Sequence, residues 1–595
     1  MNAHAHTRRS FLKTLSVGAA AAVAAPRVLL AQAPRKKPNV IIIITDDQGY
    51  GDLACHGNPY IKTPNLDRLH AQSTRLTNYH VGPTCAPTRA ALVTGRYCNR
   101  TGVWHTIMGR SILRKDEKTL AHMFAAGGYR TGHFGKWHLG DNYPSSPQYM
   151  GFEVVRRHGG GGVGQTPDYW GNDYFDDTYE HDGTFVKHTG YCTDVWFDET
   201  MKFIKASARA KKPFFAYLTT NAPHGPFNVP KKYADMYTGK KGVPNANFYG
   251  MITNIDENMG RLIKQLDDLG IADDTILIFT TDNGTAAGVG RRSRKGGGGV
   301  TGFNAGMRGT KGSEYDGGHR VPLFIRWPGG KITPGLDIAR ITAHVDIMPT
   351  LAELCGIATP KAKLDGTSLV PLLRGKDAGW PDRVLVTDSQ RVEHPVKWRK
   401  SAVMTDRWRL VNGKELYDMP ADTGQKSNVA DKYPKVVSRL RKAYDAWWAD
   451  VSKRFGEYVP IIIGSPKENP TKLTAHDWHG PGANRTWNHR QITAGGGLSN
   501  GFWAVDVARA GTYEITLARW PVEAKRKLRE RFIDVAKARL TAANVDETIS
   551  IGPEANAATF KVVLPAGETR LQASFIDAQG KTAGAYFVYV KYLGA

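Results

Sequence analysis

Long apolar runs in the first half of the chain predict strands that are buried on both faces of a sheet. The clearest is the β-branched run at residues 40–44, and similar runs cover residues 214–220 and 275–281. Continuous runs of this length are typical of parallel strands covered by helices. Helical segments are predicted between them, for example at residues 65–72 and 247–269. Strands that alternate with helices predict a helix-covered α/β sheet.

The pattern changes twice toward the C-terminus. Short strands are predicted within residues 384–418, followed by a helix at residues 434–455. Glycine and proline at residues 464–470 mark a linker, and short strands with glycine-rich turns then predict a β-sandwich. Carbohydrate-binding modules and purely structural sandwiches share this pattern, so the role of the sandwich stays open. The expected parts are an α/β catalytic domain at residues 36–375, a small sheet subdomain at 376–463 and the sandwich at 465–595.

The N-terminus has the features of an export signal. Arg8 and Arg9 precede a short alanine-rich apolar run, and the small-x-small site Ala31-Gln32-Ala33 follows it. The apolar stretch at residues 15–25 is shorter than the roughly 20 residues that a bilayer span needs. We therefore expect residues 1–33 to be a signal for the twin-arginine export machinery, with the protein in the periplasm or outside the cell and without a stable membrane span.

The net charge of the chain indicates its partners, and its cysteine content indicates whether disulfides stabilise it. The formal charge is +25, and removal of the signal takes away four basic residues and no acids, which leaves +21. Such a field concentrates polyanions. The sequence has no nucleic-acid-binding motif, so a sulfated polysaccharide is the preferred partner. The five cysteines are too scattered for a disulfide scaffold, and their odd number leaves at least one unpaired.

Two glycine runs, at residues 159–162 and 296–299, predict mobile loops. The second run follows four basic residues within 291–295. A cationic loop of this kind either grips a charged substrate or is simply a solvated surface loop.

Polar side chains follow each of the three predicted buried strands. Asp46 and Asp47 end the first strand, Asp282 and Asn283 end the strand at 275–281, and His224 lies on the loop after the strand at 214–220. Sites in open α/β sheets lie outside the carboxyl ends of the strands, so these side chains are expected to converge. The four oxygen donors of the two pairs favour a hard cation such as calcium or magnesium over zinc.

The most informative motif is Pro-Thr-Cys-Ala-Pro-Thr-Arg at residues 83–89, continuing to Thr-Gly-Arg at 94–96. A proline two residues after Cys85, followed by helix formers, places Cys85 at a helix N-terminus, where backbone N–H groups attract an anion. Arg89, one turn further on, carries a planar fork of donors suited to a tetrahedral oxyanion. The alternative is that Cys85 is a buried structural cysteine at the start of a helix, without a role in catalysis.

The motif resembles the signature of type I sulfatases, in the alkaline phosphatase-like superfamily, at every position. This resemblance implies that Cys85 is oxidised to formylglycine (3-oxoalanine) by a maturation enzyme, and that the hydrate of formylglycine is the nucleophile. Residues 128–140 are similar to the second sulfatase signature and supply Lys136 and His138, although Phe134 replaces the usual small or branched aliphatic residue. Residues 307–322 resemble a later sulfatase segment and supply Lys311.

The resemblance also implies a fold and a set of site residues. The fold would be a mixed, mainly parallel sheet covered by helices, with a small C-terminal sheet subdomain. The cation would be one Ca2+, because zinc-dependent phosphatases of the superfamily carry histidine at the position of Asn283. The expected metal ligands are Asp46, Asp47, Cys85, Asp282 and Asn283. The expected catalytic residues are Cys85, Arg89, Lys136, His138, His224 and Lys311.

The activity implied is hydrolysis of sulfate monoesters, arylsulfatase-like, with a sulfated small molecule or polysaccharide as substrate. Arg89, Lys136, Lys311, His224 and the cation would stabilise the developing charge. His138 would take the proton of the second hydroxyl of the hydrate, and His224, paired with Lys311, would protonate the departing alcohol. Two alternatives remain: a phosphonate or phosphodiester hydrolase of the same superfamily, and an inactive glycan-binding protein.

Overall fold

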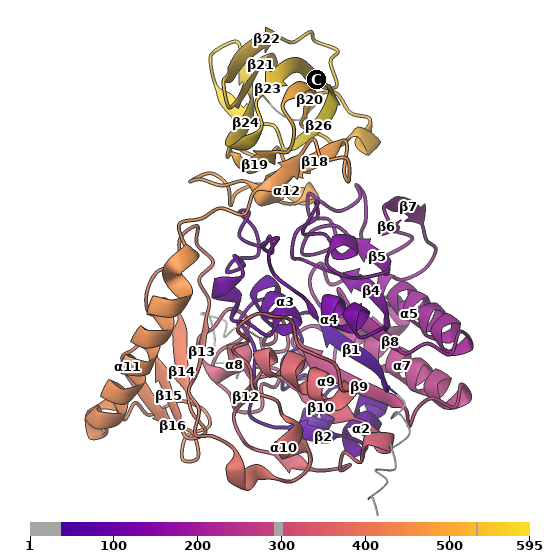
Figure 1. Cartoon of the computed structure of the whole chain (residues 1–595), viewed down its shortest axis with the longest axis vertical. Coiled ribbons are helices and arrows are strands. Elements are labelled where there is room, and N and C mark those ends of the chain that lie inside the picture. The colour runs from indigo at the N-terminus through magenta and orange to yellow at the C-terminus, as the bar shows by residue number, and fades with distance from the viewer. Residues whose placement is uncertain (1–36, 291–300, 531–532) are drawn as a thin grey trace, which may run out of the picture. The chain divides into compact units, whose positions relative to one another are not determined.

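The computed structural model describes residues 37–290, 301–530 and 533–595. The predicted export signal, and the second glycine run with the basic residues before it, lie outside the described residues. The largest element is a ten-stranded mixed sheet in the order β11-β2-β10-β9-β1-β8-β4-β5-β6-β7 (Figure 1). Its parallel centre consists of β9 (Thr275–Thr281), β1 (Asn39–Thr45), β8 (Phe214–Thr219), β4 (Arg130–Lys136) and β5 (Val154–His158).

Shorter strands extend both edges of this sheet. On one side β10 (Leu323–Arg326) pairs antiparallel with β9 and with β2 (Thr74–Leu76), which pairs in parallel with β11 (Asp337–Ile338). On the other side β6 (Thr178–His181) and β7 (Thr184–Lys187) continue from β5 in antiparallel fashion. The predicted α/β fold class is confirmed.

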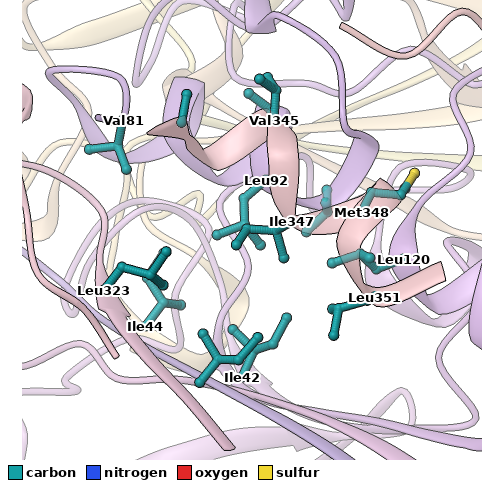
Figure 2. Close-up of a cluster of buried hydrophobic side chains, with 14 of the residues drawn as sticks. Ile42, Ile44, Val81, Leu92, Leu120, Leu323, Val345, Ile347, Met348 and Leu351 are labelled. Atoms are coloured by element: carbon teal, nitrogen blue, oxygen red, sulfur yellow. The ribbon is translucent and has the colours of Figure 1, made fainter. Parts of the chain in front are cut away.

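Helices cover both faces of the sheet because the side chains of β1 alternate between two apolar cores. Ile41 and Ile43 pack in a cluster with α2 (Pro64–Ala71), α5 (Cys192–Arg209) and α7 (Ala246–Asp268). Ile42 and Ile44 pack in a second cluster with α3 (Cys85–Thr94), α4 (Leu120–Ala126) and α9 (Ile347–Cys355). Figure 2 shows part of this second cluster around Leu92 and Leu351. Each of these fully buried isoleucines contributes about 1.5–3 kcal/mol, which holds β1 in the centre of the sheet.

A small antiparallel sheet follows the central one in sequence. It has the order β13-β14-β15-β16 and is made of Leu385–Asp388, Ser401–Met404, Trp408–Val411 and Glu415–Asp418. One face packs on α11 (Pro434–Val451), where Leu440 and Tyr444 meet Val403 and Leu410. Figure 1 shows α11 running beside these strands. These elements correspond to the small C-terminal sheet and helix that the sequence predicts.

Two further sheets enclose a common apolar core and form the predicted β-sandwich. One contains β17 (Ile461–Ile463), β19 (Trp503–Val507), β24 (Gly567–Asp577), β21 (Val535–Ala542), β22 (Val545–Ser550) and β25 (Thr582–Gly584). The other contains β18 (Thr471–Thr474), β26 (Phe587–Gly594), β20 (Gly511–Ala518) and β23 (Ala558–Leu564). Their core also includes Ile107, Met108 and Ile112 from the α/β part.

Short elements complete the architecture. The strands β3 (Tyr79–His80) and β12 (Thr342–Ala343) form a separate parallel pair. The short helices are α6 (Lys231–Ala234), α8 (Asp316–His319), α10 (Val370–Leu373) and α12 (His489–Thr493). Among the described residues, no helix has both the length and the apolar character required to cross a membrane.

Candidate active site

The predicted site residues meet at the carboxyl ends of four adjacent parallel strands. Asp46 and Asp47 directly follow β1, and Asp282 and Asn283 directly follow β9. Lys136 is the last residue of β4, with His138 two residues further on. His224 lies on the loop after β8. The order of the strands in the sheet therefore brings together residues that are more than 200 positions apart in the sequence.

A compact acidic cluster lies at the centre of the site. One ligand atom from each of Asp46, Asp47, Cys85 and Asp282 lies within 4.8 Å of the others, and all four residues are buried. Burial and the neighbouring Asp282 raise the pKa of Asp46 to about 8, which reflects the mutual repulsion of carboxylates in a dry site. A divalent cation held by these residues would relieve this repulsion.

The amide of Asn283 also suits a cation. Its Nδ2 donates to Asp47 Oδ1 at 3.0 Å, whereas its Oδ1 is buried and has no hydrogen-bond partner among the described residues. A buried oxygen without a partner is costly unless something binds it. Three carboxylates and one amide oxygen match the donors that Ca2+ prefers, so the residues present fit the expected metal.

Three basic side chains neutralise the cluster from different elements. Lys136 Nζ donates to Asp46 Oδ2. Lys311 Nζ lies 2.6 Å from Asp47 Oδ1 and 2.7 Å from Asp47 Oδ2. Burial opposes ionisation of Asp47, but Lys311, His224 and Lys136 outweigh it and hold the pKa of that carboxyl well below its usual range.

Arg89 forms the third ion pair and is completely buried. Its Nε and Nη2 donate to Asp282 Oδ2 at 3.1 and 2.8 Å, and its Nη1 donates to the carbonyl of Lys136 at 2.9 Å. The guanidinium group of Arg89 thus binds the carboxylate of Asp282 and the backbone carbonyl at the end of β4. This partner could not be inferred from the motif, which suggested a direct contact with the substrate oxyanion.

Cys85 begins α3, as the sequence predicts, and its Sγ lies 3.3 Å from Asp46 Oδ1 and 3.8 Å from Asp47 Oδ1. Burial and the adjacent Asp46 raise the pKa of the thiol well above its usual range. Only the thiolate is a strong nucleophile, so burial beside Asp46 disfavours the reactive form of an unmodified Cys85. Cys85 is therefore placed where a nucleophile is expected, but its protonated thiol is a poor nucleophile.

The two histidines of the site have different hydrogen-bond states. His138 Nε2 lies 2.8 Å from the carbonyl of Thr106 and must donate to it, which leaves Nδ1 with a free lone pair; Nδ1 is buried and has no partner among the described residues. His224 Nδ1 donates to the carbonyl of Gly225 at 2.5 Å, and its Nε2 lies 3.7 Å from Asp47 Oδ2. Burial and Lys311 lower the pKa of His224 to about 4.

A cavity of about 330 Å3 opens onto this cluster. It is lined by the predicted residues Cys85, His138, His224 and Lys311, together with Gln165, Arg391, Asn484, Trp487 and the segment 105–107. The predicted residues Asp46, Asp47, Arg89, Lys136, Asp282 and Asn283 do not line it, because they form the layer behind. Sequence reasoning missed the lining residues on loops, which lie outside any motif or strand end.

The first glycine run lies in this site and is packed, not exposed. Gly160, Gly161 and Gly162 are buried. A Cβ on Gly161 would collide with the ring of His138, and a Cβ on Gly162 would lie 3.4 Å from His224 Cε1. The run therefore allows the backbone to approach both catalytic candidates closely.

A second buried group of metal-ligand type, His80, Asp316 and His319, lies outside this site. There Arg409 Nε donates to Asp316 Oδ1 at 3.0 Å, and Arg409 Nη2 lies 3.1 Å from His80 Nε2. The guanidinium thus already supplies the positive charge of this group.

Comparisons with known proteins agree with this geometry. The sulfatase family model matches residues 38–357, and the model for the C-terminal part of N-sulphoglucosamine sulphohydrolase matches residues 310–447. Human arylsulfatase A is 33% identical over 386 residues, which cover 59% of this chain and 71% of that protein. An N-acetylgalactosamine-6-O-sulfatase of Bacteroides thetaiotaomicron is 30% identical over 490 residues, which cover 69% of this chain and 93% of that protein.

Solved structures support the same assignment. The crystal structure of Ps i-CgsB in complex with k-i-k-neocarrahexaose has a TM-score of 0.62 and 26% identity over 71% of this chain and 95% of that chain. A phosphonate monoester hydrolase of Agrobacterium radiobacter shares the fold, with a TM-score of 0.52 and 23% identity. The chain belongs to the sulfatase family, within the alkaline phosphatase-like superfamily, and is a sulfuric ester hydrolase.

Proposed function

We propose that this chain is an exported, calcium-dependent sulfatase that uses a formylglycine at position 85 to hydrolyse O-sulfate esters of a carbohydrate. The observation that carries the proposal is the position of Cys85. It begins a helix, contacts two carboxylates of a metal-type cluster and faces a cavity lined by His138, His224 and Lys311. A protonated thiol at this position is a poor nucleophile, whereas the hydrate of formylglycine would provide a hydroxyl that can attack the substrate.

Two groups would complete the chemistry. Asp46, Asp47, Asp282 and Asn283 would hold Ca2+, which supplies Lewis-acid assistance and offsets the carboxylate charge. The formylglycine hydrate would supply the attacking hydroxyl. The free Nδ1 of His138 is suited to accept a proton, because its Nε2 is committed to the carbonyl of Thr106. The rigid hydrogen bond also keeps the ring in one orientation.

The basic residues would handle the charge of the substrate. A sulfate ester carries one negative charge, and more develops on the leaving oxygen as the S–O bond breaks. Lys311 lines the cavity and stays protonated beside Asp47, so its Nζ is suited to stabilise that charge. His224 lies beside the same carboxylate and would form the leaving-group side of the site with Lys311. Lys136 and Arg89 do not line the cavity and would act indirectly, because they hold Asp46 and Asp282 in place.

The substrate class is proposed from charge and from relatives. The matched proteins include an N-acetylgalactosamine-6-O-sulfatase and an ulvan-active sulfatase. The chain itself is strongly basic, which favours an anionic polysaccharide. We also propose export by the signal at residues 1–33, maturation by a formylglycine-generating enzyme, and a part boundary near residue 375. The sequence places a second boundary near residue 464, but β17 (Ile461–Ile463) pairs with β19 of the sandwich, so we propose that this boundary lies before residue 461.

The test is to produce the protein together with a formylglycine-generating enzyme and to measure two properties. Mass spectrometry of the peptide that contains residue 85 should show aldehyde in place of thiol. Hydrolysis of 4-nitrophenyl sulfate should exceed hydrolysis of bis(4-nitrophenyl) phosphate, and a chelator should abolish it. A dominant diester rate would identify a phosphodiester hydrolase instead. A converted protein that binds a sulfated polysaccharide but releases sulfate from neither that polysaccharide nor the aryl sulfate would identify a binding protein.

A further inference from the structure

Part of the active-site wall comes from sequence that follows both matched sulfatase models. The models end at residues 357 and 447. Asn484 and Trp487 line the cavity next to Cys85 and His138, although they belong to the segment between β18 and β19 of the sandwich. The C-terminal region therefore contributes directly to the space in which the substrate binds.

Backbone hydrogen bonds hold this segment against the loop that follows the first glycine run. Thr166 N donates to the carbonyl of Trp487 at 3.0 Å, and His489 N donates to the carbonyl of Gly164 at 2.8 Å. Nearby, His476 N donates to Thr166 Oγ1 at 3.1 Å. The two main-chain bonds fix the backbone on both sides of residue 488, and this holds Trp487 at the cavity.

A second cavity adjoins the first. It has a volume of about 540 Å3 and shares three lining residues with the active-site cavity, namely Gln165, His224 and Trp487. Beyond them it is lined by Trp170 from the α/β part and by His489, Arg490 and Arg526 from the sandwich region. Both volumes fall in the range of ligand sites, and the two cavities adjoin at the three shared residues, which offers a substrate a path away from Cys85.

The side chains along this path suit a charged sugar chain. Trp487 is partly exposed, so its apolar ring can pack against a sugar ring. The ring of Trp170 is also partly exposed but already packs on the ring of His489, with 4.4 Å between the ring centroids. Arg490 is exposed, and no carboxylate among the described residues pairs with it within 4.0 Å. Arg526, in contrast, pairs with Glu530 at 3.1 Å. An unpaired guanidinium beside aromatic rings is suited to a sulfate or carboxylate group.

We propose that the sandwich region forms a second sugar subsite, with Trp487 packing against the sugar chain and Arg490 binding an anionic group on the sugar next to the one that loses sulfate. This inference rests on the proposed sulfatase function and makes it more specific. The preferred substrate is a sulfated oligosaccharide with a second anionic group, and not an isolated sulfated monosaccharide. Trp487 and Arg490 are specificity residues, since neither touches the reacting atoms.

The test compares oligosaccharides with a monosaccharide as inhibitors of 4-nitrophenyl sulfate hydrolysis. The probes are galactose 6-sulfate and tetrasaccharides from chondroitin 6-sulfate, carrageenan and ulvan. The variants are Arg490→Ala and Trp487→Ala, with Arg485→Ala as the matched control. Arg485 is exposed, lies on the same segment, has no ion pair within the described part of the chain and lines neither cavity.

In the wild type, at least one tetrasaccharide should inhibit at a concentration about tenfold or more below that of the monosaccharide, as expected for one added charge-assisted contact. Arg490→Ala and Trp487→Ala should remove most of this advantage, and Arg485→Ala should keep it. The inference is overturned if no tetrasaccharide surpasses the monosaccharide, or if Arg485→Ala matches Arg490→Ala. Failure of the proposed function itself looks different, because the converted wild type would then release no sulfate at all.

Discussion

The buried ion pair between Arg89 and Asp282 gives the sharpest prediction. Both side chains are fully buried, and all three bonds of the guanidinium go to Asp282 and to the carbonyl of Lys136. Arg89→Met has a similar length but leaves a buried carboxylate without its partner. Breaking a buried pair from one side costs about 3–5 kcal/mol, a large fraction of the stability of an ordinary domain.

The loss of stability in Arg89→Met should depend on whether Ca2+ is bound. In a chelator, Asp282 of the variant faces an uncompensated burial penalty, so the melting temperature should fall well below that of the wild type. With excess Ca2+, the proposed metal replaces the lost positive charge and stabilises the folded state according to its affinity. The variant should therefore gain more from Ca2+ than the wild type gains. Sulfatase activity should be lost in both conditions, because the carbonyl of Lys136 loses its donor and Lys136 would no longer be held in place.

Arg383→Met is the matched control. Arg383 and Asp346 are also largely buried and lie 2.9 Å apart, but they belong to neither group of metal-ligand type. Differential scanning calorimetry at one scan rate, with chelator and with Ca2+, measures all three proteins. Arg383→Met should be destabilised in chelator as well, without the extra gain from Ca2+. Equal gains in both variants would refute the placement of the cation beside Asp282, and a wild-type melting temperature for Arg89→Met in chelator would refute the energetic argument.

Three further predictions concern single positions. Cys85→Ala should abolish sulfate release and keep the far-UV circular dichroism spectrum, because Cys85 forms no disulfide within the described residues and its thiol donates to carboxylates of the site; residual turnover above background would contradict the nucleophile assignment. Gly161→Ala should lower kcat by about 100-fold, since its Cβ displaces the ring of His138. Gly162→Ala is the control and should lower kcat much less, because the nearest atom to its Cβ lies 3.3 Å away. Equal losses of kcat in the two variants would argue against a steric effect on His138. Asn283→Ala should weaken calcium binding by about tenfold in isothermal titration calorimetry, because it removes the buried oxygen that lacks a partner; an unchanged affinity would exclude Asn283 as a ligand.

The parts of the site that could be predicted from the sequence lie at the ends of regular elements. Residues 40–44 and 276–279 are apolar without interruption, which identifies strands buried on both faces, and the polar residues after each run show where the strand ends. The polar residues that follow are then placed by the topology of a parallel sheet. The start of α3 at Cys85 was predictable for the same local reason, namely the spacing of proline and helix formers.

The residues that could not be predicted are placed by contacts distant in sequence. Trp487 lies in a segment without periodic apolar residues, and its position depends on main-chain hydrogen bonds to residues 164–166. The partner of Arg89 is 193 positions away and depends on how β9 ends beside α3. Neither relation has a local signal, so a sequence pattern identifies the residue type but not its neighbour.

The segment at residues 105–112 explains why the sandwich cannot be considered apart from the active site. Ile107, Met108 and Ile112 belong to the apolar core of the sandwich, while residues 105–107 line the active-site cavity. Met108 N donates to the carbonyl of His476 at 2.8 Å, and the carbonyl of Thr106 holds the ring of His138. Removal of the sandwich would expose three apolar side chains and release the segment that orients His138. The C-terminal region therefore supports the chemistry at Cys85 through the same residues that complete its own core.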